Sequence, residues 1–252
     1  MNPSPYSPAL QVLPDYETMS QAAAAFLVEA VGRKPDALFC LPTGVSPART
    51  YELLVAQARR QPGLFDRARW LKLDEWGGLA MDDPASCEAD LRTKVIEPLR
   101  VRPERFFGWQ SRPADPAAEC RRVAGWLAAN GPIDVCLLGL GLNGHLGLNE
   151  PAEALQPDPH MASLSETSLR HAMLKSARSR PQYGLTLGMA DLLQSRRIVL
   201  LVSGTHKAEP LRRFFTREIT TQFPASFLWL HPAVTIFCDR AAAARLPKEA
   251  LP

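Results

Sequence analysis

Short runs of apolar residues recur along the chain. They alternate with segments in which apolar residues are separated by polar ones. The runs lie at residues 36–42, 67–76, 133–141, 196–204 and 233–239. Near-continuous apolar runs of this length are typical of strands in parallel sheets, because such strands are buried on both faces. The pattern therefore predicts five strands.

Between these runs lie segments whose apolar positions follow the spacing of an amphipathic helix. They span residues 18–31, 47–58, 116–129 and 207–215. In the second segment Tyr51, Leu54 and Ala58 fall on one helical face. Alternating strands and helices favour an α/β fold with an open, mostly parallel, Rossmann-like sheet and helices on both faces.

The length of 252 residues fits one domain, which we expect to span residues 1–252. Residues 149–181 contain no clear strand and form a long excursion from the alternating pattern. Such an excursion is either a lid over a site or an ordinary surface insertion, and the sequence leaves both readings open.

Charge and hydropathy exclude two classes of partner. The 29 basic and 26 acidic residues are mixed along the chain and give a net charge of +3, so we expect no nucleic-acid partner. Because no apolar run reaches 18 residues, we expect no membrane partner. Residues 1–20 lack the pattern of a signal peptide, which predicts a cytoplasmic protein.

The five cysteines are expected to be small buried hydrophobes rather than ligands or disulfides. Their number is odd, no C-x-x-C occurs, and Cys40, Cys136 and Cys238 lie inside apolar runs. No cysteine and histidine cluster has the spacing of a zinc site. The sequence therefore predicts no metal and no cofactor.

Ligands of open α/β sheets bind beyond the carboxyl ends of the strands, so the segments that follow each strand are informative. Thr43, Gly44, Val45 and Ser46 follow the first strand. With Ser46 as N-cap and Pro47 in the first helical position, this loop would present free amides to a phosphate. A plain strand-to-helix turn is the alternative.

The second strand is followed by two carboxylates, Asp74 and Glu75, beside Trp76. A carboxylate at a strand end is a candidate general base, and its position favours Asp74. Glu75 is expected to be a solvated surface carboxylate.

A glycine-rich loop, GLGLNGHLGLNEP at residues 139–151, follows the third strand. It includes Asn143 and Gly144 and brings His145 and Glu150 close together. A histidine titrates near neutral pH, and a carboxylate can set its tautomer and charge. The glycines lack the spacing of a dinucleotide-binding loop. The pair therefore predicts a reactive site.

Lys207 follows the fourth strand, near the expected start of a helix. The positive end of a helix dipole disfavours a cation, and a bound anion would resolve that conflict. Lys207 is thus either a second phosphate contact or a solvated surface lysine.

Together these motifs resemble the glucosamine-6-phosphate deaminase family, which shares its fold with the 6-phosphogluconolactonases. The resemblance runs from about Leu38 to Asp239 and covers LPTGVSP, LKLDEW, GLGLNGHLGLNEP, YGLTLGMADLL, LLVSGTHKAE and SFLWLHP. It looks closest to the galactosamine-6-phosphate deaminase/isomerase branch.

The resemblance implies a role for each matching residue. Asp74 would move a proton between C2 and C1 of the sugar, and His145, working with Glu150, would open the pyranose ring. The expected phosphate and substrate contacts are Thr43, Gly44, Val45, Ser46, Gly144 and Lys207. Asn143 stands where many members have Asp, and Arg170 lies nearest to the family's phosphate arginine.

The reaction implied by the resemblance is an isomerisation with deamination that uses no metal or cofactor. A 2-amino-2-deoxyhexose 6-phosphate would give a ketohexose 6-phosphate and ammonia, with galactosamine 6-phosphate favoured over glucosamine 6-phosphate. A lactone-hydrolysing enzyme and a non-catalytic sugar-phosphate sensor are the alternatives. The expected partner is a small sugar phosphate, and the sequence leaves a homo-oligomer open.

Overall fold

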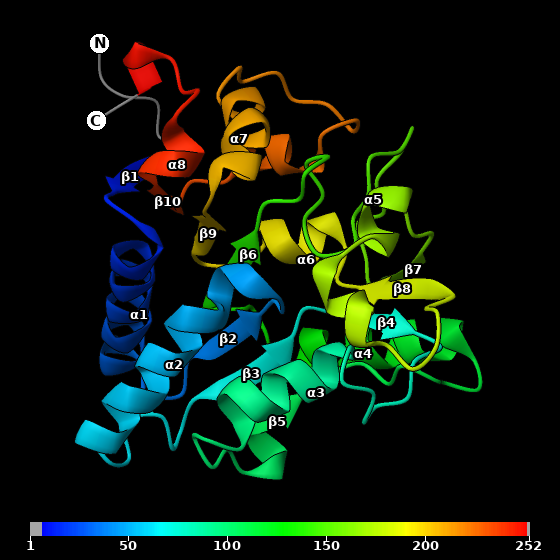
Figure 1. The fold of residues 1–252 in the computed structure, drawn as a ribbon. Coiled ribbons are helices and arrows are strands. Elements are labelled where there is room, and N and C mark those ends of the chain that lie inside the picture. The colour runs from blue at the N-terminus through cyan, green and yellow to red at the C-terminus, as the bar shows by residue number, and fades with distance from the viewer. Residues whose placement is uncertain (1–6, 251–252) are drawn as a thin grey trace.

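A computed structural model describes residues 7–250 and places a seven-stranded parallel sheet at their centre (Figure 1). The strands are β1 Ala9–Leu13, β2 Leu38–Leu41, β3 Arg69–Lys72, β5 Phe106–Phe107, β6 Val135–Gly139, β9 Ile198–Val202 and β10 Val234–Asp239. Their order in the sheet is β1-β10-β9-β6-β2-β3-β5, and every neighbouring pair is parallel. The predicted α/β fold is confirmed.

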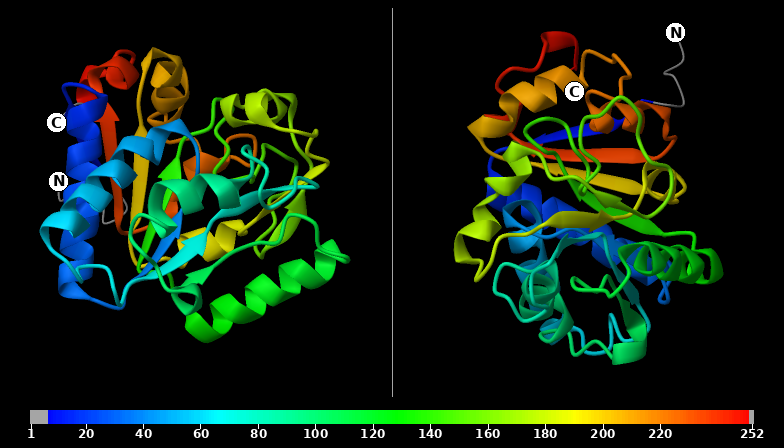
Figure 2. Two further views of the ribbon diagram at one scale, coloured as in Figure 1. Left: turned by 60° about the horizontal axis from the view of Figure 1, so that its bottom comes forward. Right: turned by 90° about the vertical axis from the view of Figure 1, so that its right-hand side faces the viewer.

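Helices cover both faces of this sheet (Figure 2). The α-helices are α1 Tyr16–Arg33, α2 Val45–Arg60, α3 Cys87–Leu91, α4 Pro116–Asn130, α5 Glu166–Leu169, α6 Met189–Leu193, α7 Ala208–Phe214 and α8 Arg240–Ala243. The shorter turns are the π-helix η1 Arg92–Ile96 and the 3-10 helices η2 Pro103–Arg105, η3 Ala172–Ser176, η4 Thr205–Lys207, η5 Pro224–Leu230 and η6 Lys248–Ala250.

Alternation along each central strand divides the buried side chains between two cores. In β2, Phe39 and Leu41 pack with α1, α2 and η1, whereas Leu38 and Cys40 pack with α4, α6, α7 and α8. This two-sided burial explains why the central strands read as continuous apolar runs.

A second, antiparallel sheet has the order β4-β8-β7 and lies beside the main sheet, on the right of Figure 1. Its strands are β4 Asp74–Gly77, β7 His160–Ala162 and β8 Tyr183–Thr186. The single strand predicted at 67–76 is therefore two strands. The chain leaves the main sheet at Leu73, whose amide still bonds Leu41 but whose carbonyl accepts the Leu187 amide of the segment after β8.

The excursion at 149–181 was expected to lack a clear strand, but it contains β7 together with α5 and η3. The strand is short and only its last residue, Ala162, is buried, so its apolar pattern is weak. Whether the segment acts as a lid stays a prediction.

The chain order of the strands reverses between β2 and β6. On one side of this point the strands follow in the order β2, β3, β5. On the other side they follow in the order β6, β9, β10. Ligands of such sheets bind at this switch point. The loops after β2 and β6, which hold most of the predicted site residues, meet there.

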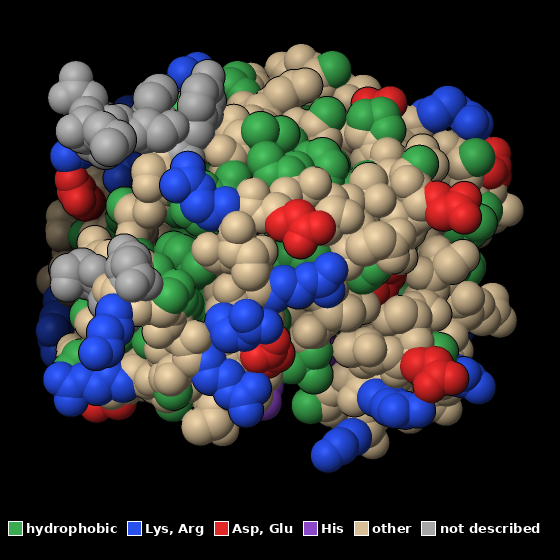
Figure 3. Space-filling model, turned by 90° about the horizontal axis from the view of Figure 1, so that it is seen from above, with side chains coloured by type: hydrophobic (Ala, Val, Ile, Leu, Met, Phe, Trp, Pro, Cys, Tyr) green, Lys and Arg blue, Asp and Glu red, His purple; other side chains and the backbone are tan. Residues whose placement is uncertain are grey.

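The expected domain covered residues 1–252, of which 1–6 and 251–252 lie outside the described residues. Among residues 7–250, no helix combines the length and the apolar character needed to cross a membrane. On the face drawn in Figure 3, Lys and Arg side chains lie among acidic and hydrophobic ones.

Candidate active site

After the loop that follows β2, α2 begins two residues earlier than the sequence predicted. Gly44 is the N-cap, with φ +96° and ψ −160°, and Val45 is the first helical residue. Ser46 is therefore not the N-cap and Pro47 is not in the first helical position. A positive φ is open to glycine at little cost, and it turns the chain into the helix before Ser46 is reached.

This geometry leaves polar groups free for a ligand. The amides of Val45 and Ser46, in the first turn of α2, have no acceptor within the helix. The Ser46 hydroxyl faces the end of β6, with Oγ 4.0 Å from the place a Cβ on Gly139 would take. The Gly44 amide is not free in this way, because it donates to Oδ2 of Asp90 at 3.4 Å.

Lys207 approaches the same place from the other half of the sheet. It ends η4 and caps α7, and its Nζ donates to the carbonyl oxygen of Leu140, beyond β6, at 2.5 Å. Burial lowers the pKa of the Lys207 ammonium to about 8. The structure thus holds this cation inside the switch point rather than on the surface.

Asp74 is the first residue of β4 and is half-buried. Burial, reinforced by the nearby charge of Glu75, raises the pKa of its carboxyl to about 7, while Lys72 and Cys87 act in the opposite direction. A weak hydrogen bond of 3.9 Å joins the Cys87 thiol to Asp74 Oδ1, and the Thr43 hydroxyl donates to the same sulfur at 3.2 Å. Cys87 thus connects the loop after β2 to the Asp74 carboxyl.

Glu75 was expected to be solvated, and that expectation is wrong because the residue is fully buried. The ammonium of Lys72, also fully buried, donates to Glu75 Oε2 at 2.6 Å, to Glu88 Oε2 at 2.8 Å and to the Trp109 carbonyl at 2.9 Å. Glu75 also accepts the Cys87 and Glu88 amides. It fixes the start of α3 against β4 and thereby positions Asp74 and Cys87.

His145 and Glu150 come together in the loop after β6. His145 Nδ1 lies 3.5 Å from Glu150 Oε2, within ion-pair range. Asn143 connects the two residues, since its Nδ2 donates to Glu150 Oε2 at 2.9 Å and its Oδ1 accepts the His145 amide at 3.2 Å. The sequence predicted this cluster, and the structure shows that Asn143 holds both of its members.

The carboxyl of Glu150 is strongly acidic. Burial acts to raise its pKa, but hydrogen bonds and charge from His145, together with Ser168 and Asn143, outweigh burial and lower the pKa to about 2. Its Oε1 accepts from the Ser168 hydroxyl and from the Ser165 hydroxyl at 3.0 Å. Glu150 therefore also ties the loop to the beginning of α5.

Gly144 shapes the loop that carries His145. Its φ is +87°, and a Cβ there would lie 2.1 Å from the ring of Phe223. No other residue type fits that gap without a shift of the backbone or the ring. Gly144 supplies this tight turn, and its predicted contact with substrate stays a prediction.

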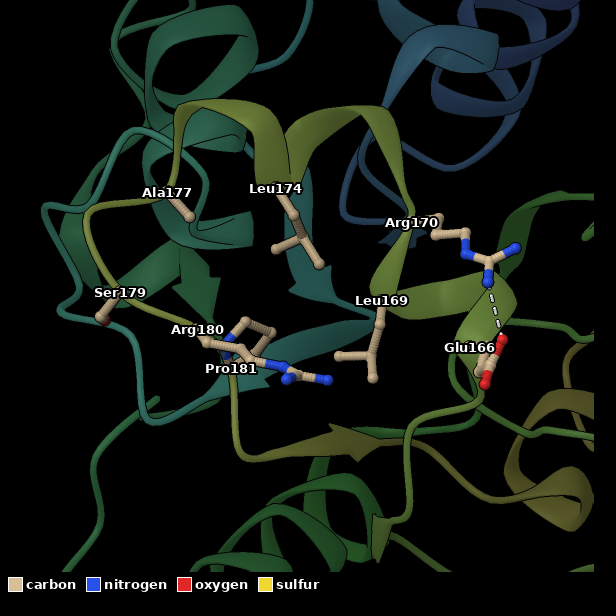
Figure 4. A pocket seen from close by; sticks show the side chains of 8 residues that line it. All are labelled: Glu166, Leu169, Arg170, Leu174, Ala177, Ser179, Arg180 and Pro181. Atoms are coloured by element: carbon tan, nitrogen blue, oxygen red, sulfur yellow. Dashed lines mark hydrogen bonds and ion pairs between the residues drawn. The ribbon is translucent and has the colours of Figure 1, made fainter.

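Arg170, the candidate phosphate arginine, does not lie with these residues. Its guanidinium is mostly exposed and donates to Glu166 Oε2 at 2.8 Å (Figure 4). It borders a pocket of about 610 Å³ on the 149–181 segment, lined by Glu166, Leu169, Arg170, Leu174, Ala177, Ser179, Arg180 and Pro181. Arg170 is the one predicted site residue in that lining.

The next residue, His171, does reach the loop after β2, and the sequence analysis missed it. Its ring lies against Gly44, with Cε1 3.4 Å from the place a Cβ would take. The ring centroid is also 6.0 Å from that of Trp76. His171 lies in an irregular segment, where no helical or strand periodicity predicts which side chains face the loop after β2.

Within residues 7–250, no group of three or more His, Cys, Asp or Glu side chains is arranged to hold a metal ion. The functional groups at the switch point are instead hydroxyls, amides, a lysine, a carboxyl and a histidine–carboxylate pair. This set suits binding of a phosphate and transfer of protons.

Comparison with known proteins agrees with this geometry. A family model described as glucosamine-6-phosphate isomerases/6-phosphogluconolactonase matches residues 14–236. The chain belongs to this family.

Several curated members of the glucosamine-6-phosphate isomerase/6-phosphogluconolactonase family are similar over nearly the whole chain. AgaI of Escherichia coli (strain K12), a provisionally named deaminase, is 40% identical over 222 residues, which are 88% of each chain. Glucosamine-6-phosphate deaminase 1 of Bacillus subtilis (strain 168) is 37% identical over 235 residues, 92% of this chain and 97% of that protein.

Solved structures place the chain in the same family fold. A monomeric glucosamine-6-phosphate deaminase superposes with a TM-score of 0.90 at 35% identity, covering 94% of this chain and 99% of that one. The 6-phosphogluconolactonase of Trypanosoma brucei superposes with a TM-score of 0.78 at 20% identity, covering 96% and 99%. At that identity the lactonase shows the shared fold alone.

Proposed function

We propose that this member of the family deaminates and isomerises a 2-amino-2-deoxyhexose 6-phosphate, giving a ketohexose 6-phosphate and ammonia. The observation that carries the proposal is the Asp74 carboxyl, whose pKa of about 7 suits a group that takes and returns a proton near neutrality. The similarity to proteins named as deaminases supports it.

The phosphate end of the substrate would bind at the start of α2. The amides of Val45 and Ser46, the hydroxyls of Thr43 and Ser46 and the ammonium of Lys207 offer donors from both halves of the sheet. A phosphate dianion next to Lys207 would offset the burial that lowers the pKa of this lysine. Anchoring the substrate at its far end orients the reacting carbons.

Ring opening is assigned to His145 with Glu150. Because the pKa of Glu150 is about 2, its carboxylate remains anionic throughout the neutral range, and it lies 3.5 Å from His145 Nδ1, where it can orient the imidazole. His145 then moves a proton from the O1 hydroxyl to the ring oxygen, which releases the open-chain amino aldose. Asn143 adds no charge but orients both groups.

Proton transfer between carbons is assigned to Asp74. Its carboxylate removes the C2 proton while O1 takes a proton from the neighbouring ammonium group, which gives a cis-enolamine, and the resulting acid returns a proton to C1. The C2 iminium that forms is attacked by water, and ammonia leaves as the ketone appears. Every step is acid–base chemistry, so we expect activity to survive dialysis against a chelator.

The favoured substrate is galactosamine 6-phosphate. This choice is supported by the resemblance of the DEW, NGHLGLNEP and PASFLWLH segments to the galactosamine-6-phosphate branch. The two epimers differ at C4, so the residues that select between them must contact the C4 hydroxyl. Trp76 and the 149–181 segment are the candidates.

The test is ammonia release from both amino-sugar 6-phosphates, with 6-phosphogluconolactone hydrolysis as the control. Ammonia from either epimer, faster with the galacto form, is the expected result. Lactone hydrolysis without ammonia release would overturn the proposal and favour the lactonase reading.

A further inference from the structure

The ring of His171 is held in one tautomer by its own backbone. It caps η3 through Nδ1, which accepts the Met173 amide at 3.3 Å. A nitrogen that accepts a hydrogen bond carries no proton, so in the neutral ring the proton is on Nε2. The imidazole therefore presents an N–H donor on the side away from η3.

That donor lies beside the loop after β2. Nε2 lies 3.6 Å from the place a Cβ on Gly44 would take, and Cε1 lies 3.4 Å from it. A Cβ on Gly44 would be in ordinary van der Waals contact with the ring, so the imidazole and the loop are direct neighbours. Within residues 7–250, Nε2 makes no hydrogen bond to another group. It is also not one of the buried, unpaired side-chain polar atoms, so it is open to solvent. A ligand on the loop can reach it.

The electrostatic surroundings of His171 also favour an anion. Burial, with the charges of His145 and Lys207, lowers the pKa of His171, and only Asp90 acts against this shift. Positive charge near a neutral N–H donor is a suitable environment for a phosphate. Arg170, one residue earlier, is turned away to Glu166.

We propose that His171 binds the 6-phosphate of the substrate through Nε2–H, beside the amides of Val45 and Ser46 and the ammonium of Lys207. The identity of the ligand rests on the proposed function, whereas the anion site itself does not. The 149–181 segment would then supply one wall of the phosphate site.

Two substitutions test the roles of the two ring nitrogens separately. In His171→Asn the amide oxygen can still cap the Met173 amide, but the distal donor is lost. His171→Gln places an amide nitrogen near the position of Nε2 and keeps a donor there. Arg170→Ala, in the adjacent exposed residue, is the matched control.

Steady-state kinetics with the amino-sugar 6-phosphate distinguish these variants. We expect His171→Asn to raise KM and lower kcat/KM roughly tenfold to a hundredfold, the usual range for a lost hydrogen bond to a charged group. His171→Gln should recover part of that loss, and Arg170→Ala should stay within about twofold of the wild type. Unchanged kinetics in His171→Asn, or an equal loss in Arg170→Ala, would overturn the proposal.

Inorganic phosphate provides a readout that does not depend on turnover. Phosphate added to the wild-type protein should shift the imidazole ¹⁵N signals of His171, and calorimetry should show weaker phosphate binding by His171→Asn than by His171→Gln. If phosphate leaves the His171 signals unmoved, the proposal is wrong even where the enzyme is active. If the signals move but no ammonia is released from any amino sugar, only the proposed function fails.

Discussion

Asp74→Asn should abolish turnover and at the same time stabilise the folded protein above neutral pH. The carboxyl is raised from its ordinary pKa of 3.8 to about 7 on folding. At about 1.4 kcal/mol per pH unit, holding the ionised form in place costs up to about 4 kcal/mol of the free energy of unfolding. Because the side chain is only half-buried and keeps some water, we expect about 2–4 kcal/mol.

The sign of this effect fixes its pH window. Below pH 4 the carboxyl is protonated in both states, so the wild type carries no penalty. As the pH rises from about 4 to about 7, the unfolded state loses its proton first and the wild type loses stability. An asparagine resembles the neutral carboxyl and avoids the loss, so the advantage of Asp74→Asn should grow over this window and stay constant above it.

Urea unfolding of both proteins at pH 4, 6 and 8, with ammonia release at pH 8, measures the prediction. Asp82→Asn is the matched control, because Asp82 is exposed and its pKa is lowered by pairing with Arg178 rather than raised. The reasoning is refuted if Asp74→Asn is no more stable than the wild type at pH 8, or if its advantage is as large at pH 4. Near-normal ammonia release by the variant would refute the catalytic role.

Three further predictions follow from other parts of the site. Glu150→Gln should lower kcat roughly tenfold to a hundredfold by slowing ring opening, and substrate enriched in the open-chain form should partly restore the rate; no restoration would contradict the assignment. Raising the pH through about 8 should increase KM as Lys207 loses its proton, which an initial-rate series from pH 7 to 9.5 measures; a flat KM would argue against phosphate binding there. Gly144→Ala should destabilise the fold by about 3 kcal/mol in urea, whereas Gly125→Ala, in open space within α4, should stabilise it by about 0.5–1 kcal/mol; equal effects would contradict the steric argument.

The central strands were predictable because burial on both faces leaves an apolar residue at nearly every position. The runs at β2, β6, β9 and β10 carry this signal and were found. By contrast, no residue of β1 is fully buried, β8 mixes Gly184 and Thr186 with its apolar residues, and β5 and β7 have two and three residues. A short or half-exposed strand depends on its sheet partners, which a local pattern does not contain.

The loops at the switch point were predictable as candidates, but the partners of their side chains were not. Lys72 and Glu75 are three residues apart and look like surface charges in the sequence. They are buried because Glu88, on another element, closes the ion pair. A carboxylate is tolerated inside a protein only with such partners, and those partners come from tertiary structure.

The same limit applied to the basic residues. Arg170 and His171 are neighbours, and the family resemblance pointed to Arg170 because it lies nearest to the family's phosphate arginine. The cap that His171 makes with Met173 turns the imidazole to Gly44 and leaves the guanidinium outside. Local hydrogen bonds decide which of two neighbouring side chains in an irregular segment faces the site. Such bonds leave no periodic pattern in the sequence.

The pairing of β1 with β10 joins the two ends of the fold, with Ala9 opposite Thr235 and Leu13 opposite Asp239. The apolar face of α1 also rests on β9 and β10. During synthesis on a ribosome, α1 can pack against α2 and β2 early, whereas the contacts of β1 and α1 with β9 and β10 form only after those later strands have emerged. Until then the apolar face of α1, which carries Met19, Leu27 and Val31, lacks its β9 and β10 partners, so this part of the core is completed late in folding.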